Sequence, residues 1–251
     1  MKQEIWHGDC LELMKNIPDK SVDMILCDLP YGTTACKWDV VIPFAPLWVE
    51  YNRVAKKTAA IALFGSEPFS SSLRMSNIKN WKYDWIWEKS KGCNFTHAKN
   101  MPIKFHEEIC IFSNGKIGHF VQLGEKRMPY NPQGLVKVDK KWSRLQKYEN
   151  GHALSRESHQ LERIIEFENY PKSILKFGNS DNRERGLHPT QKPVALLEYL
   201  IKTYTNKNEL VLDNCAGSGS TLVAAKNLNR QFIGIEKEKK YYDVCLKRLE
   251  M

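Results

Sequence analysis

The sequence predicts an α/β fold with a doubly wound, mostly parallel sheet of seven strands. Short apolar runs typical of buried strands occur at 22–27, 59–64, 210–212 and 232–235, and segments with helical spacing separate them. A glycine-containing stretch at 213–221 follows the third of these runs directly. Because strands that alternate with helices pair in parallel, the pattern predicts a sheet covered by helices on both faces.

The first part of the chain supplies the elements around the earliest buried strand. Residues 4–7 are a candidate for a short strand, and Leu11, Met14 and Ile17 follow at helical spacing. After the apolar strand at 22–27 we expect a helix at 46–57, a strand at 59–64, and further strands at 85–87 and 109–112.

The last part of the chain begins near residue 188 and alternates regularly. Val194, Leu197, Ile201 and Tyr204 recur at intervals of three, four and three, which describes one face of a helix. Pro193 stands in the first turn, where a missing N–H costs nothing. A strand at 210–212, a helix at 221–228, a strand at 232–235 and a helix at 241–249 follow in order.

The region between these two parts has a different composition. Glycine, proline and charged residues interrupt 113–187, and from 113 to 192 there are 15 Lys plus Arg against 9 Asp plus Glu. We therefore assign 1–114 and 173–251 to two halves of one α/β domain and 115–172 to a basic insertion. The surplus charge suits a solvated insertion or a surface for nucleic acid.

Composition excludes several classes of protein. With 251 residues, 42% of them hydrophobic, the chain suits a globular domain and not a disordered segment. Its apolar runs are far shorter than the ~20 residues of a membrane span, and its first residues lack a signal-peptide pattern. Seven cysteines without a C-x-x-C pair indicate neither a disulfide framework nor a zinc site. A net charge of +9 points toward a polyanionic partner.

Asp213 opens the stretch D-N-C-A-G-S-G-S-T, which leads from a predicted strand into a predicted helix. Glycines let the backbone approach a ligand, and a helix N-terminus presents free N–H groups. Glu236 ends the next strand, 23 residues later, where an acid can accept hydrogen bonds from both ribose hydroxyls. These features predict a nucleoside site, the alternative being a structural turn with a surface glutamate. Phosphate-binding loops fit less well, because G-K-[ST] and G-x-G-x-x-G are absent.

The tetrapeptide Asp28-Leu-Pro-Tyr31 follows the strand at 22–27, at the end where open α/β sheets bind ligands. Its carboxylate and a main-chain carbonyl can accept hydrogen bonds from an exocyclic amino group while the tyrosine stacks on the base. Pro30 constrains the turn. Because Asp and Pro are common turn residues, the tetrapeptide carries weight only together with the other motifs.

Taken in order, the motifs resemble those of β-class DNA amino-methyltransferases, which modify adenine N6 or cytosine N4 using S-adenosylmethionine. The motifs are Gly8-Asp-Cys10, Asp28 to Tyr31, residues 87–95, His188-Pro-Thr-Gln-Lys-Pro193 and Asp213 to Thr221. The resemblance covers 4–112 and 170–249. It implies a Rossmann-like, circularly permuted methyltransferase, in which the catalytic strand precedes the cofactor strand. The first half of the domain is then catalytic, the second half binds the cofactor, and the insertion recognises the target.

The resemblance also assigns individual residues. The catalytic tetrad is Asp28, Leu29, Pro30 and Tyr31, with Leu29 acting through its carbonyl where the family usually has proline. The cofactor residues are Asp9, Cys10, Thr190, Gln191, Lys192, Asp213, Ala216, Gly217, Gly219, Thr221 and Glu236. Among these, Asp9 is expected at the adenine amino group, Glu236 at the ribose and Lys192 near the methionine carboxylate. Cys215 stands where the family often has phenylalanine, which removes one apolar contact.

The predicted activity is site-specific methylation of adenine N6 in duplex DNA. The target base must be flipped into the pocket, because it cannot be reached inside the duplex. S-adenosylmethionine is the expected cofactor, and no metal is expected. Asp28 favours adenine, since cytosine enzymes of the family more often carry serine there. The alternatives are cytosine-N4 methylation, a catalytically inactive DNA-binding module, and an enzyme that acts on RNA or protein.

The expected partner is double-stranded DNA, and no membrane partner is expected. The basic residues predicted to contact DNA are Lys126, Arg127, Lys140, Lys141, Arg144 and Lys147. A homodimer and a cognate restriction endonuclease are further partners to consider. The expected location is the cytoplasm of a bacterial or phage-like system, at the nucleoid.

His106, Glu107 and Glu108 together could suggest a metal site. An H-E-x-x-H pattern is absent, and the apolar alternation that follows favours a strand in which one of the two acids faces solvent. We therefore expect a structural polar contact here and no catalytic role.

Overall fold

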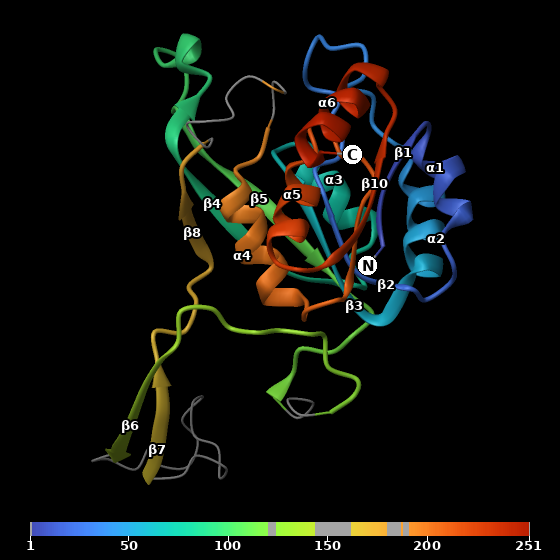
Figure 1. Cartoon of the computed structure of the whole chain (residues 1–251). Coiled ribbons are helices and arrows are strands. Elements are labelled where there is room, and N and C mark those ends of the chain that lie inside the picture. Colours follow the sequence, from blue (N-terminus) through green and yellow to red (C-terminus); the bar gives the residue numbers. More distant parts are fainter. Residues whose placement is uncertain (1, 120–123, 144–161, 180–186, 188–190, 251) are drawn as a thin grey trace. The chain divides into compact units, whose positions relative to one another are not determined.

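The computed structural model describes residues 2–119, 124–143, 162–179, 187 and 191–250. They divide into two compact units (Figure 1). The first unit contains residues 1–131 and 173–251, and the second contains residues 132–172. Four positions named above, His188, Thr190, Arg144 and Lys147, lie outside the described residues.

The first unit is built on a mostly parallel sheet, as the sequence predicts. Eight described strands take the order β1 (Gln3–His7), β10 (Gln231–Glu236), β9 (Leu210–Asp213), β2 (Val22–Cys27), β3 (Ala55–Gly65), β5 (Lys104–Phe112), β4 (Trp81–Cys93) and β8 (Ile174–Phe177). All neighbours pair in parallel except β5, which runs antiparallel to both β3 and β4.

The strand that the sequence analysis did not anticipate is β8. It pairs in parallel with β4 and raises the expected seven strands to eight among the described residues. It has only four residues, and of these only Leu175 is buried. So short a segment carries too little periodicity to be recognised without its partner strand.

Helices cover both faces of the sheet, which confirms the doubly wound arrangement (Figure 1). The helices are α1 (Cys10–Leu13), α2 (Phe44–Val54), α3 (Phe69–Ser76), α4 (Val194–Tyr204), α5 (Ser220–Asn227) and α6 (Lys239–Leu249), with short 3-10 turns η1 (Met14–Asn16) and η2 (Phe95–His97). One core packs α4, α5 and α6 against the sheet, and the other packs α1, α2 and α3. None of the described helices has the length and apolar character that crossing a membrane requires.

The two cores explain why the central strands are continuously apolar. Along β2, Met24 and Leu26 belong to the core beneath α4 and α5, whereas Ile25 and Cys27 belong to the core beneath α1 and α2. Successive side chains of a strand point to opposite faces, so a strand covered on both sides needs apolar residues at every position.

The pairing of β2 with β9 positions the functional motifs. Met24 lies opposite Val211 and Ile25 opposite Leu212, so the residues that follow both strands emerge at one edge. Chain connections leave this point in opposite directions, toward β10 and β1 on one side and toward β3 on the other. Such a switch in strand order opens a crevice in which α/β proteins bind ligands.

The second unit contains an antiparallel ladder where the sequence suggested irregular structure. Strand β6 (Val136–Ser143) pairs with β7 (Glu162–Glu168), and Lys140 lies opposite Ile165. Nδ2 of Asn169 donates a hydrogen bond to the carbonyl of Gly134, over 2.8 Å. Among the ladder residues whose side chains the structure describes, none is buried, and apolar Val136 and Ile164 are exposed. Without a buried face to impose an alternating pattern, the ladder could not be recognised from the sequence.

We predict that Tyr204→Phe lowers the free energy of unfolding. The Tyr204 hydroxyl is buried and accepts a hydrogen bond from Trp85 Nε1 at 2.6 Å, and it lies 2.9 Å from the hydroxyl of Tyr83. Leaving the buried indole N–H without an acceptor costs about 1–3 kcal/mol, which urea denaturation measures. The exposed Tyr170→Phe serves as the control, and an equal effect of both changes would contradict the prediction.

Candidate active site

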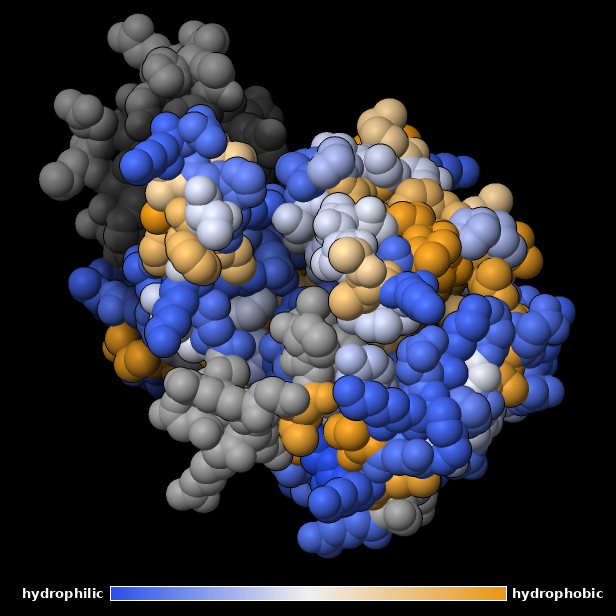
Figure 2. Space-filling model, turned by 90° about the horizontal axis from the view of Figure 1, so that it is seen from above, coloured by the Kyte–Doolittle hydropathy of each residue, from blue (hydrophilic) through white to orange (hydrophobic). Residues whose placement is uncertain are grey.

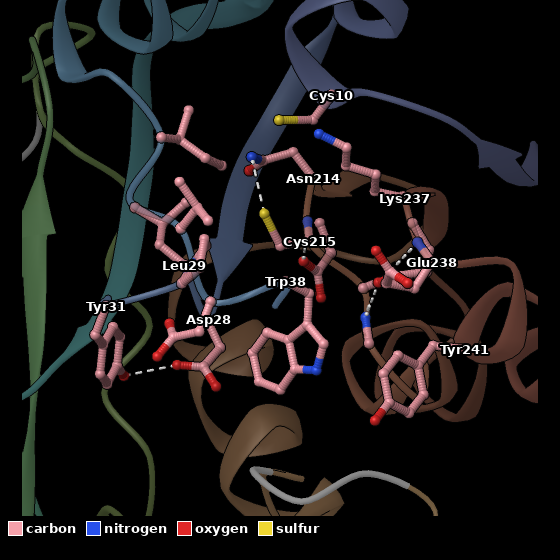
Figure 3. Close-up of a pocket in the computed structure, with 18 of the residues that line it drawn as sticks. Cys10, Asp28, Leu29, Tyr31, Trp38, Asn214, Cys215, Lys237, Glu238 and Tyr241 are labelled. Carbon is pink, nitrogen blue, oxygen red and sulfur yellow. Dashed lines mark hydrogen bonds between the residues drawn. The ribbon is translucent and has the colours of Figure 1, made fainter. Parts of the chain in front are cut away.

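A pocket of about 360 Å³ opens at the carboxyl edge of the sheet, within the size range of small-molecule sites. Its walls are the residues that follow β1, β2, β9 and β10, together with residues 33–43. Figure 3 shows Asp28 and Tyr31 on one side of this pocket and Lys237, Glu238 and Tyr241 on the other. The motifs from the two ends of the chain therefore line one cavity.

The turn between β9 and α5 is held open by glycines and tied to the end of β10. Gly217 has a φ of 53°, a conformation that favours glycine, and its N–H donates to Glu236 Oε2 over 2.7 Å. Glu236 Oε1 accepts a second hydrogen bond from the Glu238 N–H, also 2.7 Å long. Burial raises the pKa of Glu236. The carboxylate is thus fixed at the pocket with a defined orientation.

Asp213 lies at the bottom of the same turn. Its Oδ1 accepts a hydrogen bond from the N–H of Cys215 over 3.1 Å. Burial raises the pKa of Asp213 to about 6, against the opposing effect of a hydrogen bond from Thr221. Ala216 and Thr221 also line the pocket. Gly219, with a φ of 77°, lies behind the turn, where an added Cβ would approach Cys245 Sγ to 3.0 Å.

The segment after β1 closes the pocket beside this turn. Asp9 caps α1 by accepting a hydrogen bond from the Leu11 N–H over 3.0 Å, and its other oxygen lies 3.2 Å from Lys237 Nζ. Cys10 is buried next to Asn214 and Cys215 (Figure 3). Gly8 donates its N–H to the Glu236 carbonyl over 3.0 Å. The segments that carry Asp9 and Glu236 are therefore hydrogen-bonded to each other beside the pocket.

Asp28 and Tyr31 form the opposite side of the pocket. The Tyr31 hydroxyl donates a hydrogen bond to Asp28 Oδ1 at 2.6 Å (Figure 3). The Tyr31 ring stacks on Phe69 with centroids 4.8 Å apart, which holds the ring in place. Leu29 is buried and anchors the turn, and Pro30 lines the cavity. The geometry leaves an acidic oxygen and an aromatic ring at one point of the cavity.

Lys192 connects Asp28 to a second carboxylate. Its ammonium forms an ion pair with Asp28 Oδ2 and lies 3.4 Å from Glu107 Oε2, while Lys89 pairs with Glu107 Oε1. Burial raises the pKa of Asp28, and Lys192 opposes that rise. Burial also works to raise the pKa of Glu107, but Lys192 and Lys89 outweigh it and hold this pKa below its usual value. The four groups form a buried chain of alternating charge.

Glu107 corrects one expectation. We expected one of Glu107 and Glu108 to face solvent, yet the side chains of both are at least 86% buried, being only 14% and 10% exposed. Glu107 precedes Ile109 and Ile111 at intervals of two, and these belong to the core beneath α4. That spacing was the available signal, since an acid in phase with core residues points inward.

The segment after Tyr31 adds residues that the sequence analysis did not single out. Asp39 accepts hydrogen bonds from the N–H groups of Gly32, Thr33 and Thr34 over 2.9, 2.9 and 2.7 Å. These bonds fold residues 32–39 into a closed loop. Trp38 on this loop meets the Tyr241 ring edge-on, with centroids 6.5 Å apart, and both lie in the pocket (Figure 3). In the sequence, the only local sign of this loop was an acid shortly after Gly-Thr-Thr.

The pocket is acidic although the protein is basic. Its lining includes seven carboxylates, Asp9, Asp28, Asp39, Glu107, Asp213, Glu236 and Glu238, and three lysines, Lys37, Lys192 and Lys237. Gln191 also lines it, and its buried Oε1 accepts no hydrogen bond from any residue that the structure describes. Such a cavity suits a ligand that carries positive charge and hydrogen-bond donors.

The remaining described residues of the prediction are not among those that line the pocket. Lys126 is exposed, and Arg127 donates from Nη2 to the carbonyl of Tyr130 over 3.3 Å. Lys140 and Lys141 are exposed on β6 in the second unit. Within the described part of the chain, His, Cys, Asp and Glu side chains form no group of three or more suited to a metal ion.

We predict that Lys192→Met destabilises the protein most strongly at neutral pH. Removing the cation leaves Asp28 ionised and buried without its ammonium partner, which costs about 3 kcal/mol, while Lys89 still pairs with Glu107. Burial already raises the pKa of Asp28 above its unfolded value, and without Lys192 this pKa rises further. The loss of stability is therefore full at neutral pH and shrinks as the pH falls toward 5, because Asp28 then becomes protonated in the folded state.

Denaturation at pH 7.5 and pH 5 measures this effect. The matched control is Lys176→Met, which breaks an exposed pair with Glu88 and should change stability little at either pH. A Lys192→Met variant as stable as the wild type at pH 7.5 would show that the buried pairing contributes nothing.

Comparison with known proteins gives a consistent match over nearly the whole chain. A family model described as "DNA methylase" matches residues 22–247. The chain is 47% identical to the Type II methyltransferase M.HindIII of Haemophilus influenzae, over 98% of this chain and 94% of that protein. It is 29% identical to the Type II methyltransferase M.HinfI of the same species, over 98% of this chain and 67% of that protein.

Solved structures share the fold. A crystal structure of the M1.HpyAVI–SAM complex matches with a TM-score of 0.62 and 25% identity, covering 98% of both chains. The cytosine-N4-specific PvuII DNA methyltransferase matches with a TM-score of 0.65 and 14% identity, covering 99% of this chain and 86% of that one.

Proposed function

This chain belongs to the DNA methylase family of S-adenosylmethionine-dependent amino-methyltransferases, and we propose that it methylates adenine N6 at a specific sequence in duplex DNA. The observation that carries the proposal is the shared pocket of Asp28 and Tyr31 with Asp213 and Glu236. Asp28 and Tyr31, which can hold an amino nitrogen, thus lie across one cavity from the turn of Asp213, which can bind a nucleoside.

The pocket's residues fit the cofactor. S-adenosylmethionine, when bound, supplies a methyl group activated by a positively charged sulfur. The acidic lining suits that charge, and Gln191 among the lining residues would offer its side-chain amide to the ligand. Glu236, oriented by Gly217 and Glu238, would accept hydrogen bonds from the ribose hydroxyls. Asp9, Cys10 and Asp213 complete this side of the site.

On the other side, Asp28 and Tyr31 would bind the target base. The base is flipped out of the duplex, stacks on the Tyr31 ring and donates its amino hydrogens to Asp28 and the Leu29 carbonyl. This orientation aims the nitrogen lone pair along the line of methyl transfer, and positioning of this kind supplies much of the rate. Lys192, held between Asp28 and Glu107, keeps the Asp28 carboxylate ionised and fixed.

The choice of adenine rests on Asp28, the residue type at that position in adenine enzymes of this class. Cytosine-N4 methylation is the alternative, and among the structural matches the PvuII enzyme is named cytosine-N4-specific. An inactive DNA-binding module is disfavoured, because Asp28, Tyr31, Asp213 and Glu236 are all present and line one pocket.

We predict that Asp28→Ala strongly slows methyl transfer and spares cofactor binding. Losing the acceptor for the amino hydrogens should lower the rate by roughly 100-fold or more. Transfer of a labelled methyl group to unmethylated genomic DNA measures the rate, and calorimetry measures S-adenosylmethionine affinity. Mass spectrometry of the digested wild-type product identifies the base.

Asp243→Ala is the matched control, because that exposed acid on α6 pairs only with Lys239 among the described residues. Full activity in Asp28→Ala would overturn the mechanism. N4-methylcytosine in the wild-type product would overturn the choice of adenine and leave the reaction type intact.

We propose further that sequence recognition resides in the basic insertion, residues 115–172. Neutralising Lys140, Lys141, Arg144 and Lys147 together should weaken DNA binding and reduce its dependence on salt, because each lost phosphate contact lowers the slope by about 0.9. Binding measured across a salt titration tests this. If the quadruple variant binds and methylates DNA normally, these four residues are not part of the DNA interface.

The same proposal covers the partners and the location. Double-stranded DNA is the substrate, and the Type II relatives support a place in a restriction-modification system. We also expect a cognate endonuclease, which co-purification would test, and a homodimer, which sedimentation would test. Microscopy of a tagged chain would test the expected cytoplasmic location at the nucleoid.

A further inference from the structure

The hairpin formed by β4 and β5 extends beyond the sheet at the edge that carries the pocket. β4 runs parallel to β3, because both pair antiparallel with β5, so β4 ends at the same edge as β2 and β3. Lys104 Nζ donates to Ser66 Oγ, just after β3, over 2.6 Å. Figure 1 shows the hairpin projecting above the sheet with η2 at its end. We call residues 91–103 the hairpin tip.

The hairpin tip is a built structure. Asn94 adopts a φ of 56°, and its Oδ1 accepts a hydrogen bond from the Lys104 N–H over 2.9 Å. Asn179, just after β8, forms two hydrogen bonds of 3.0 Å with the backbone N–H and carbonyl of Lys91. At Gly92 an added Cβ would lie 2.3 Å from Ile103 Cγ2. The side chains at the tip are therefore presented by an ordered backbone.

These presented side chains are apolar and basic. Phe95 is 75% exposed, Met101 is 53% exposed and Ile103 is 40% exposed, so exposed apolar side chains gather on this one turn. From 89 to 106 the sequence contains four lysines and no acid, and Lys91 and Lys99 are exposed. Figure 2 looks onto this edge of the molecule and shows apolar residues bordered by hydrophilic ones.

The base of the hairpin is joined to the catalytic residues. Lys89 on β4 pairs with Glu107 on β5, and Glu107 contacts Lys192, which pairs with Asp28. The hairpin tip thus stands on the strands that support the catalytic carboxylate. A duplex whose flipped base reached Asp28 would lie against this edge.

We propose that the hairpin tip is a second DNA-contacting surface, separate from the basic insertion; this inference rests on the proposed function. Lys91 and Lys99 would contact phosphates, and Phe95 would pack against the bases or sugars beside the flipped base. A second copy of this chain fits the patch less well, because two tips that carry lysines and no acids repel each other. An exposed aromatic ring between two lysines matches the surface of a nucleic acid.

Two variants separate the two contacts. Lys91→Ala/Lys99→Ala should weaken binding to a labelled mixed-sequence duplex and reduce the slope of log K against log salt by about 1 to 2. Phe95→Ala should weaken binding about 5-fold or more at each salt concentration and leave the slope unchanged. Both should methylate unmethylated genomic DNA more slowly at limiting DNA, with S-adenosylmethionine affinity unchanged by calorimetry.

The matched controls lie at the opposite edge of the sheet. Lys57→Ala/Lys79→Ala removes two exposed lysines there, and Met75→Ala removes an apolar side chain that is 70% exposed. If the tip variants bind DNA as these controls do, the inference is wrong, and so it is if Phe95→Ala alters only the sedimentation of the protein. A wild-type chain that transfers no methyl group to DNA would instead refute the proposed function.

Discussion

The parallel pairing of β2 with β9 is the constraint on which the site depends. It joins strands from opposite ends of the chain and places Asp28 and Asp213 at one edge, where the strand order switches. Neither strand could be removed without separating the two walls of the pocket. Apolar residues on both faces of β2 and β9, shared between two cores, hold this pairing in place.

The protein as a whole is basic, whereas its pocket is acidic. The chain carries a net charge of +9, yet seven carboxylates line its pocket. Carboxylates gathered in a partly buried cavity repel one another, and Lys192 and Lys237 reduce that repulsion by pairing with Asp28, Glu107 and Asp9. The arrangement suits a cationic cofactor within and a polyanionic substrate outside.

Much of the fold could be predicted, because its strongest signals are local. The apolar runs of β2, β3, β9 and β10 and the helical spacing of α4 each lie in one short window. The strand β8 and the ladder of β6 with β7 were missed, because a four-residue strand and a ladder without a core leave no periodic pattern. The pocket's motif residues were recognisable by their order, whereas Glu107 and Trp38 belong to no such motif.

The sequence by itself therefore determined the family, the mostly parallel sheet and the motifs that line the pocket. The signal for each of them lies within short stretches of the chain. Only the tertiary structure decided what those motifs contact. It pairs Lys192 with Asp28 and Glu107, turns Glu107 inward, brings Trp38 against Tyr241, and carries the hairpin tip to the edge at which the pocket opens. These contacts join residues far apart in the chain, and their energies depend on burial and distance, which no local pattern encodes.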